Sequence, residues 1–347
     1  MTGAIHARTT ATRRPRRGTD NRRRRPMKLK TLAKVMATTA TLALATNANA
    51  ADIAVIAGSA QDAFFNIVKK GVDDAALVVQ ANGGKVTYLT VPNYDNFGPD
   101  LVGLINTAIS QNVQGIAIPI WVPDAQVPAL QEAAKKGIKI MMYNSGGENR
   151  EKVSGINYFG SEEKTAGVAG GAYMAKHGAK KIMCVIHVPG AVNLETRCNG
   201  VEEGAKANGA TVVKLPLPAN LDANAAGTAE AIKAELLKDP TVDAVITLGS
   251  PVADAAALAI QQAGVGDKVK LGTFDMSAAV LGRIKDGSQA MAIDQQPYAQ
   301  SFLATTMLAA NIDFGIELPT VPVLTGPAIV DSSNVEAALG GVGKGAR

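Results

Sequence analysis

The chain is poor in aromatic residues, cysteine and histidine. Only 4% of its 347 residues are aromatic, and it has two cysteines and three histidines. The histidines and cysteines lack the spacing of a metal site. No glycine-rich loop stands between a strand pattern and a helix pattern, and no serine, histidine and acid set suggests a nucleophile. We therefore expect neither an enzyme nor a cofactor or metal.

A long apolar run is also absent, but a short one follows Met27. The small residues Ala48-Asn49-Ala50 end it as an A-x-A-like cleavage site. The run is too short and too weakly apolar to hold a membrane. We expect residues 1–50 to be a cleaved leader, with translation starting at Met1 or Met27. The rest should be exported to a periplasm without a lipid anchor, since no cysteine lies in the leader or directly after it.

Excess positive charge is confined to the leader. Residues 1–50 carry 12 of the 35 lysines and arginines and one of the 30 acidic residues. The remaining chain has 23 basic and 29 acidic side chains, so its balance is mildly acidic. The charge therefore predicts no nucleic-acid partner. The length of the remaining chain suggests two domains of roughly 100–200 residues each.

Short branched runs alternate with longer amphipathic runs after the leader, and the alternation restarts after Ser154. Strands separated by helices imply parallel sheets. The abundance of Ala, Val, Ile and Gly suits helices packed closely on such sheets. We predict an α/β fold of two doubly wound, Rossmann-like lobes. The glycine-rich residues 335–347 are expected to form a flexible tail.

Polar and aromatic residues follow several of the predicted strands, where doubly wound sheets bind their ligands. The candidates are Gln61, Asp62, Phe64, Phe65, Asn144, Asp275 and Gln295. Each of the two adjacent phenylalanines either packs inward or faces the crevice, where a ring would cover the apolar face of a sugar. Asp275 either caps a helix or accepts hydrogen bonds from sugar hydroxyls, and a carboxylate can do both.

Two further residues have open roles. Arg197 stands near a predicted helix start, where the helix dipole opposes a cation. This favours a ligand or a partner for its guanidinium, with a surface salt bridge as the alternative. Trp121 follows the third strand and either lines the cleft mouth or wedges between the lobes.

The two cysteines, Cys184 and Cys198, are predicted on a strand and on the helix that covers it. An even number of cysteines in an exported protein favours a disulfide between them. Two free buried thiols are the alternative.

Several motifs together resemble the ribose/galactose-type periplasmic sugar-binding proteins of ABC importers, with their type I fold. They are Phe64-Phe65, Arg197 with Gly200, Phe274-Asp275, and the run Asp294-Gln295-Gln296-Pro297-Tyr298. The resemblance covers residues 51 to about 331, and the order and spacing of the motifs carry it. It implies that the aromatics stack on the sugar while Arg, Asp and Gln hydrogen-bond its hydroxyls. It also implies a three-segment hinge near residues 157–160, 294–296 and 321–325.

The chain departs from the ribose-binding pattern at four places. Asp62 stands where an Asn is common, Asn144-Ser145 replace an Asp-Arg pair, Gly249-Ser250 replace an Asn-Asp pair, and Leu221 replaces a stacking aromatic. The resemblance thus implies a pocket of different shape that lacks one charged clamp. A hexose, an amino sugar or a polyol fits this pattern as well as a pentose such as ribose.

The resemblance yields one full expectation. The lobes would be residues 51–158 with 296–322, and 159–294 with 323–334. The expected ligand-binding residues are Gln61, Asp62, Phe64, Phe65, Trp121, Asn144, Arg197, Leu221, Gly249, Asp275 and Gln295. We expect a monomer that captures a sugar by hinge closure and delivers it to an ABC transporter permease. The alternative is a sensor that presents its closed form to a chemoreceptor or histidine kinase.

Overall fold

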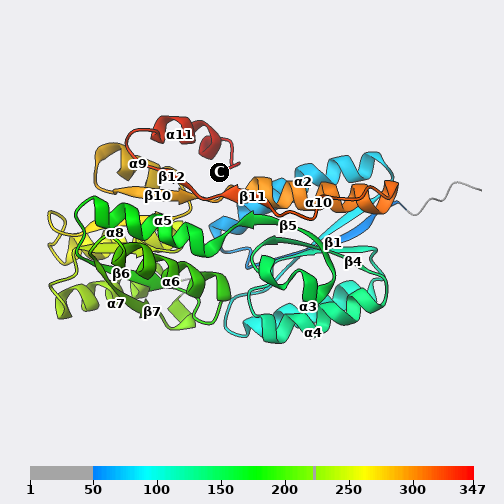
Figure 1. Ribbon diagram of the computed structural model, residues 1–347, viewed down its shortest axis with the longest axis horizontal. Helices are drawn as coiled ribbons and strands as arrows, with labels where there is room; N and C mark the ends of the chain where they lie inside the picture. Colours follow the sequence, from blue (N-terminus) through cyan, green and yellow to red (C-terminus); the bar gives the residue numbers. More distant parts are fainter. Residues whose placement is uncertain (1–49, 222–223) are drawn as a thin grey trace, which may run out of the picture. The chain divides into compact units, whose positions relative to one another are not determined.

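The computed structural model describes residues 50–221 and 224–347 (Figure 1). The predicted leader lies outside these residues except for Ala50. Within them, no helix combines the length and apolar character that crossing a membrane requires. The described residues form two six-stranded, mostly parallel sheets with helices packed on them. The predicted α/β fold with two doubly wound lobes is therefore confirmed.

The first sheet has the strand order β11-β5-β4-β3-β1-β2, and its described strand pairs are parallel. Helices α2 and α10 lie side by side on it, and so do α3 and α4 (Figure 1). Its elements are β1 (Asp52–Ala57), α2 (Ala63–Ala81), β2 (Lys85–Thr90), α3 (Phe97–Ser110), β3 (Gly115–Ile118), α4 (Pro123–Lys135), β4 (Lys139–Asn144), the 3-10 helices Gly147–Asn149 and Glu151–Val153, β5 (Gly155–Ser161), α10 (Pro297–Phe314) and β11 (Val323–Gly326).

The second sheet has the order β12-β10-β9-β8-β6-β7, in which only β12 runs antiparallel among the described strands. Its elements are α5 (Glu163–Lys176), β6 (Lys181–Ile186), α6 (Val192–Lys206), β7 (Thr211–Pro216), the 3-10 helix Ala219–Leu221, α7 (Ala225–Lys238), β8 (Ala244–Thr247), α8 (Ser250–Gln262), β9 (Lys270–Phe274), α9 (Ala278–Asp286), β10 (Met291–Asp294), β12 (Ala328–Val330) and α11 (Val335–Gly343).

The inner strands of both sheets are almost continuous apolar runs. Residues 53–57 of β1 and the whole of β3 and β8 are buried. This is the pattern of parallel strands whose two faces are both covered by helices. The apolar runs therefore form the core of each sheet and leave polar side chains to the strand ends.

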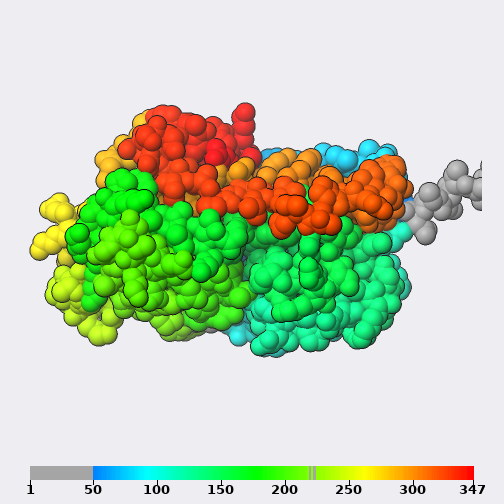
Figure 2. Space-filling model, viewed as in Figure 1, coloured from blue at the N-terminus to red at the C-terminus, as the bar shows by residue number. Residues whose placement is uncertain are grey.

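The chain crosses between the two sheets at residues 161–163, 294–297 and 326–328. The second crossing begins where the sequence predicts it. The first and third come a few residues later, because β5 and β11 stay paired as far as Ser161 and Gly326. Residues 159–161 and 323–326 therefore belong to the first sheet rather than to the second lobe. Figure 2 shows the orange-to-red residues from α10 to α11 running across both groups of elements on this face.

The prediction of a flexible tail over residues 335–347 is wrong for most of that segment. Val335 to Gly343 form helix α11, whose buried Val335 and Ala338 pack with Leu281 and Ile284 of α9. The many glycines hide this short apolar face in the sequence. Beyond the helix, the guanidinium of Arg347 forms an ion pair with the buried carboxylate of Asp294.

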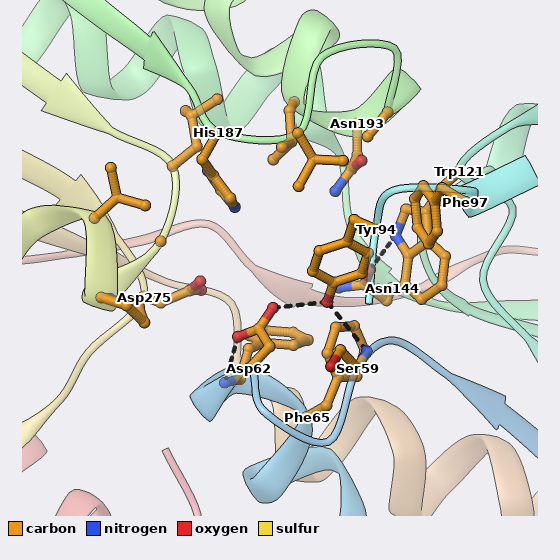
Figure 3. A pocket seen from close by; sticks show the side chains of 18 of the residues that line it. Ser59, Asp62, Phe65, Tyr94, Phe97, Trp121, Asn144, His187, Asn193 and Asp275 are labelled. Carbon is orange, nitrogen blue, oxygen red and sulfur yellow. Dashed lines mark hydrogen bonds between the residues drawn. The ribbon is translucent and has the colours of Figure 1, made fainter. Parts of the chain in front are cut away.

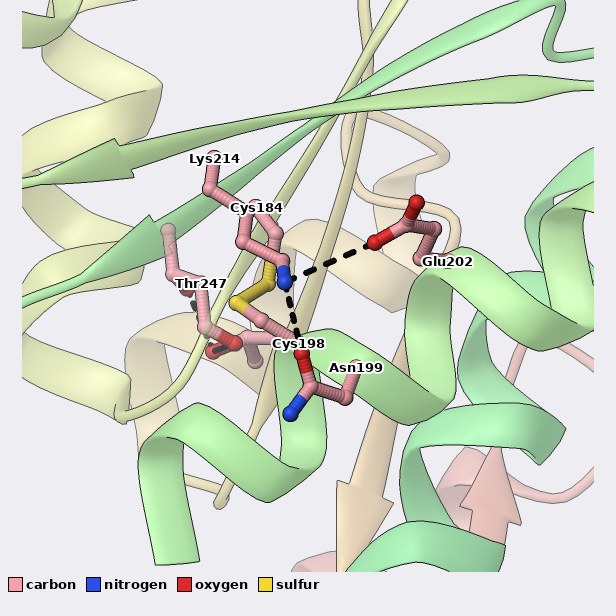
Figure 4. The surroundings of a disulfide bond; sticks show 7 residues. Cys184, Cys198, Asn199, Glu202, Lys214 and Thr247 are labelled. Atoms are coloured by element: carbon pink, nitrogen blue, oxygen red, sulfur yellow. Dashed lines mark hydrogen bonds and ion pairs between the residues drawn. A yellow bond between two sulfur atoms is a disulfide. The ribbon is translucent and has the colours of Figure 1, made fainter. Parts of the chain in front are cut away.

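A disulfide joins Cys184 of β6 to Cys198 of α6, with their Cα atoms 5.9 Å apart (Figure 4). This confirms the predicted pairing. Closing a loop of this length contributes about 3 kcal/mol in the chain-entropy model. The bond fastens α6, the helix that carries Arg197, directly to a strand of the second sheet. Nearby, the ammonium of Lys214 contacts Asn199 and Glu202 on the same helix.

Helices α5 and α6 pack against each other through glycines. A Cβ added to Gly167 or to Gly200 would lie 2.9 Å from the Cα of the other residue and would overlap a backbone carbonyl of the facing helix. Gly171 and Gly204 make equally close approaches one turn further along. The glycine-rich segment of α5 is therefore a packing surface, and it brings the first turn of α5 against Arg197.

The substitution Gly200→Ala should lower the free energy of unfolding by about 1–3 kcal/mol, because the added methyl overpacks a backbone contact. Gly103→Ala is the matched control: it lies exposed inside α3, where an added Cβ meets nothing within 4 Å. It should leave stability unchanged or raise it by up to about 1 kcal/mol. Urea unfolding followed by circular dichroism measures both, and equal effects would contradict the role of this packing.

Candidate functional site

A cavity lies beyond the carboxyl ends of the strands, lined by residues from both sheets (Figure 3). Its empty space is about 920 Å³, including the part open to solvent. The sequence-predicted residues that line it are Gln61, Asp62, Phe64, Phe65, Trp121, Asn144, Arg197, Gly249, Asp275 and Gln295. Leu221 is not among them. It follows the edge strand β7, and its side chain lies beside Gly227 instead.

Aromatic rings from the first sheet's elements form one wall of the cavity. Trp121 is the centre of this wall: it stacks on Phe97 at 5.3 Å and meets Phe65 edge-on at 5.5 Å. Phe64 meets Phe65 edge-on, and Tyr94 meets Phe97 in the same way. Phe65 is buried whereas Phe64 is half-buried. The rings thus support one another and still present apolar surface to the cavity.

Asp62 combines a structural bond with a place in the cavity. Its Oδ1 accepts from the backbone N–H of Phe64 at 3.0 Å and so caps α2, and its Oδ2 accepts from the hydroxyl of Tyr94 at 2.9 Å. Burial raises the pKa of the Asp62 carboxyl, although both hydrogen bonds oppose the rise. The carboxylate is therefore held in a fixed orientation at the floor of the site drawn in Figure 3.

Asn144 ends β4 with its side chain fully engaged by the protein. Its Oδ1 accepts from the indole N–H of Trp121 at 3.1 Å, and its Nδ2 donates to Gln300 at 3.2 Å and to Gln295 at 3.5 Å. Asn144 thus connects the aromatic wall with a residue that follows a strand of the second sheet. Asn144 therefore lines the cavity and also helps to fix the orientation of Trp121 and Gln295.

Gln295 lies at the centre of a buried polar network. Its Oε1 accepts from Nη2 of Arg197 at 2.9 Å, and its Nε2 donates to Oδ1 of Asp275. Arg197 also forms a two-point ion pair with Glu163, and its guanidinium lies 4.6 Å from the ring centre of Phe274. Both members of the ion pair are almost completely buried. The surface salt bridge considered for Arg197 is therefore excluded.

Burial controls the protonation of the acidic groups in this network. It raises the pKa of the Asp275 carboxyl to about 7, against the opposing effects of Arg197 and Gln295. Burial likewise raises the pKa of Glu163, and the guanidinium of Arg197 opposes that rise. In residues 50–221 and 224–347, no group of three or more His, Cys, Asp or Glu side chains is placed to hold a metal ion.

Three non-glycine residues next to the cavity have a left-handed backbone. They are Asn144 (φ 61°), Asp275 (φ 68°) and Gln296 (φ 56°), at the ends of β4, β9 and β10. Asn and Asp tolerate this conformation better than other side chains. Such conformations cluster at functional sites, where the surrounding structure maintains them. Here they turn the chain sharply as each strand ends.

Several residues of the cavity are absent from the sequence prediction. Asn93, Tyr94 and Phe97 follow β2, and His187 and Asn193 follow β6. The rule that directs attention to strand ends applies equally to these two strands and could have found them. Glu163 could not be found in this way, because only the packing of α5 on α6 brings it to Arg197.

Comparisons with known proteins agree with this geometry. Residues 53–316 of this chain match the family model of the periplasmic binding protein domain. A carbohydrate transporter from Acidothermus cellulolyticus, solved in complex with myo-inositol, is 35% identical, with a TM-score of 0.78 over 86% of this chain and 99% of that one. An ABC transporter solute-binding protein from Burkholderia graminis, in complex with D-arabinose, is 26% identical with a TM-score of 0.71 over 83% and 98%. The xylose/arabinose-binding protein XylF of Sulfolobus acidocaldarius is 22% identical over 80% of this chain and 70% of its own length.

The substitution Arg197→Met should lower the free energy of unfolding by about 3 kcal/mol or more, because it leaves the carboxylate of Glu163 buried without its partner. Adding Glu163→Gln to the variant should recover much of that loss. Lys164→Met is the control, since it removes an exposed ion pair between the same two helices, from Lys164 of α5 to Glu203 of α6, and should have no measurable effect. Thermal and urea unfolding measure all three, and an unaltered Arg197→Met protein would contradict a structural role for the pair.

Proposed function

The chain belongs to the periplasmic binding protein family, a family of sugar-binding proteins of ABC transporters and not of enzymes, and we propose that it captures a neutral monosaccharide or cyclic polyol in the cavity between its sheets. The observation that carries the proposal is the pairing of an aromatic wall with a buried polar network across one cavity. Rings can cover the apolar face of a sugar, while fixed donors and acceptors bond its hydroxyls.

The charges around the cavity favour an uncharged ligand. Asp62 and Asp275 contribute two carboxyl groups, and the guanidinium of Arg197 is already paired with Glu163. An anionic sugar such as a uronate would meet these carboxylates without a free cation to balance them. The relatives support the same class, since one solved structure binds myo-inositol and another binds D-arabinose. A six-membered ring rich in hydroxyls is the ligand class we favour.

The three crossings between the sheets support a closing motion of two lobes. Each lobe contributes one sheet with its helices, and residues 161–163, 294–297 and 326–328 would form the hinge. A ligand can favour the closed form only by binding it more tightly than the open one, so it must contact both lobes. The closed protein would deliver its ligand to an ABC permease from the periplasm. Presentation to a receptor would use the same closure and differs only in the partner.

Neutral cyclic polyols and pentoses should stabilise the protein against heat. At a concentration about 100 times Kd, a ligand adds about 2.7 kcal/mol, which corresponds to several degrees in Tm. A thermal-shift panel of myo-inositol, D-arabinose, D-xylose and D-glucose tests this, with D-glucuronate as the anionic control. Small-angle scattering of the protein should show compaction when a ligand that raises its Tm is added. Absence of any shift, or equal binding of glucuronate, would contradict the proposal.

Affinity should rise with pH between about 5.5 and 8 because of Asp275, whose pKa lies near 7 in the free protein. Its ionised carboxylate accepts hydroxyl protons better than its neutral form, so binding lowers this pKa and releases a proton. The ligand should bind at least tenfold more tightly at pH 8 than at pH 5.5. A pKa that binding lowers by one unit corresponds to about 1.4 kcal/mol, which is a factor of ten in affinity.

Calorimetry in buffers with different ionisation enthalpies measures both the affinity and the released proton. Asp275→Asn is the control, and it should bind more weakly and lose the pH dependence. A wild-type affinity that stays constant across this range would show that the Asp275 carboxylate does not accept from the ligand.

A further inference from the structure

Two side chains on the second-sheet side of the cavity lack hydrogen bonds. Nδ1 of His187 and Oδ1 of Asn193 are buried, and neither has a partner among the described residues. His187 directly follows β6, and Asn193 lies in the first turn of α6. Both line the cavity and point toward the space opposite Tyr94 and Asp62 (Figure 3). These two atoms are closed off from the cavity, so a ligand would meet the other polar atoms of the same side chains, Nε2 of His187 and Nδ2 of Asn193. No described residue hydrogen-bonds those atoms either, and buried polar groups nearly always have partners.

Gly249 opens the space in front of His187. A Cβ at this position would lie 3.5 Å from Cε1 and 3.7 Å from Nε2 of His187, and 3.9 Å from Oδ2 of Asp275. The three residues therefore converge on one small volume that any side chain at position 249 would enter. The backbone of Gly249 is extended, with φ −169°, a conformation that every residue adopts. A glycine at position 249 therefore matters because it leaves open space beside His187 and Asp275.

The groups around this volume are complementary to a hydroxyl. Burial and the nearby charge of Arg197 lower the pKa of His187 to about 4, so the imidazole is neutral at pH 7. A neutral imidazole has one N–H donor and one acceptor nitrogen. Oδ2 of Asp275 accepts no hydrogen bond from the described residues, unlike Oδ1, which is bonded to Gln295. A hydroxyl placed here could donate to Asp275 and accept from His187.

We propose that His187, together with Asn193, Gly249 and the free oxygen of Asp275, forms a hydroxyl-binding subsite that selects ligands with a ring hydroxyl at this end of the cavity. This inference rests on the proposed sugar or polyol binding and specifies which residues set its selectivity. A ligand with hydrogen at that ring position would leave the imidazole and the amide unbonded. A carboxylate there would face Asp275 without a cation.

The test compares the wild-type chain with His187→Ala, using myo-inositol and D-arabinose in calorimetry and then the monodeoxy analogues of whichever binds. His187→Ala should weaken binding about 10- to 100-fold. For the analogue that lacks the recognised hydroxyl, the two proteins should bind equally. His177→Ala is the matched control, because His177 is exposed at the end of α5 and bonds the carbonyl of Tyr173. It should bind as the wild type does.

A second variant and a spectroscopic signal keep loss of folding separate from loss of binding. Gly249→Ala should fold with an unchanged Tm, since its backbone is extended and the nearest contacts of the added methyl are ordinary ones. It should nevertheless bind at least tenfold more weakly, because the methyl occupies the subsite. In NMR spectra of the wild type, ligand should shift the imidazole signals of His187 and leave those of His177 in place.

The outcomes separate this inference from the proposed function. If the wild type binds and His187→Ala binds within twofold of it, the subsite is overturned while sugar binding stands. Unshifted His187 signals in a ligand-saturated sample would overturn it too. If the wild type binds none of myo-inositol, D-arabinose, D-xylose and D-glucose, the subsite and the proposed function fail together.

Discussion

The hydrogen bonds of the Gln295 amide hold the polar half of the cavity together. One planar group accepts from Arg197, donates to Asp275 and contacts Asn144, so it connects three strand ends and both sheets. Gln295 can do this because it lies in one of the three segments that pass between the sheets. Of these three contacts, the one to Asn144 reaches the first sheet, so a change in the angle between the sheets would alter it. The same amide that organises the binding groups is placed to register the relative position of the two sheets.

This network depends on packing that lies outside the cavity. Glycines allow α5 and α6 to approach until their backbones touch, and this contact sets Glu163 opposite Arg197. The disulfide holds α6 against β6 on the other side. Burying a charged pair is costly unless its geometry is good and its remaining donors are bonded. The close helix contact provides that geometry, and it leaves the guanidinium rigid enough to bond Gln295 as well.

The sequence predicts the fold and most of the cavity for one reason: parallel strands separated by helices bring their carboxyl ends to the same edge. Residues that directly follow strands, such as Asn144, Asp275 and Gln295, could be chosen on that rule alone. Glu163 could not, because its partner lies 34 residues away and only the glycine contact joins them. Leu221 comes from the resemblance alone. It follows the edge strand β7 and is not among the residues that line the cavity. Helix α11 was missed because glycine interrupts its short apolar face.

The two walls of the cavity differ in how far the protein satisfies its own polar groups. On the first-sheet side, the hydroxyl of Tyr94 bonds Asp62 and the indole of Trp121 bonds Asn144. That wall offers a ligand mainly preorganised apolar surface. On the second-sheet side, His187, Asn193 and one oxygen of Asp275 remain without bonds among the described residues. A ligand that packs its flat face on the rings and turns its hydroxyl edge to the second sheet would meet both needs. Its binding energy would then come from both sheets, and this is the condition under which binding can favour closure.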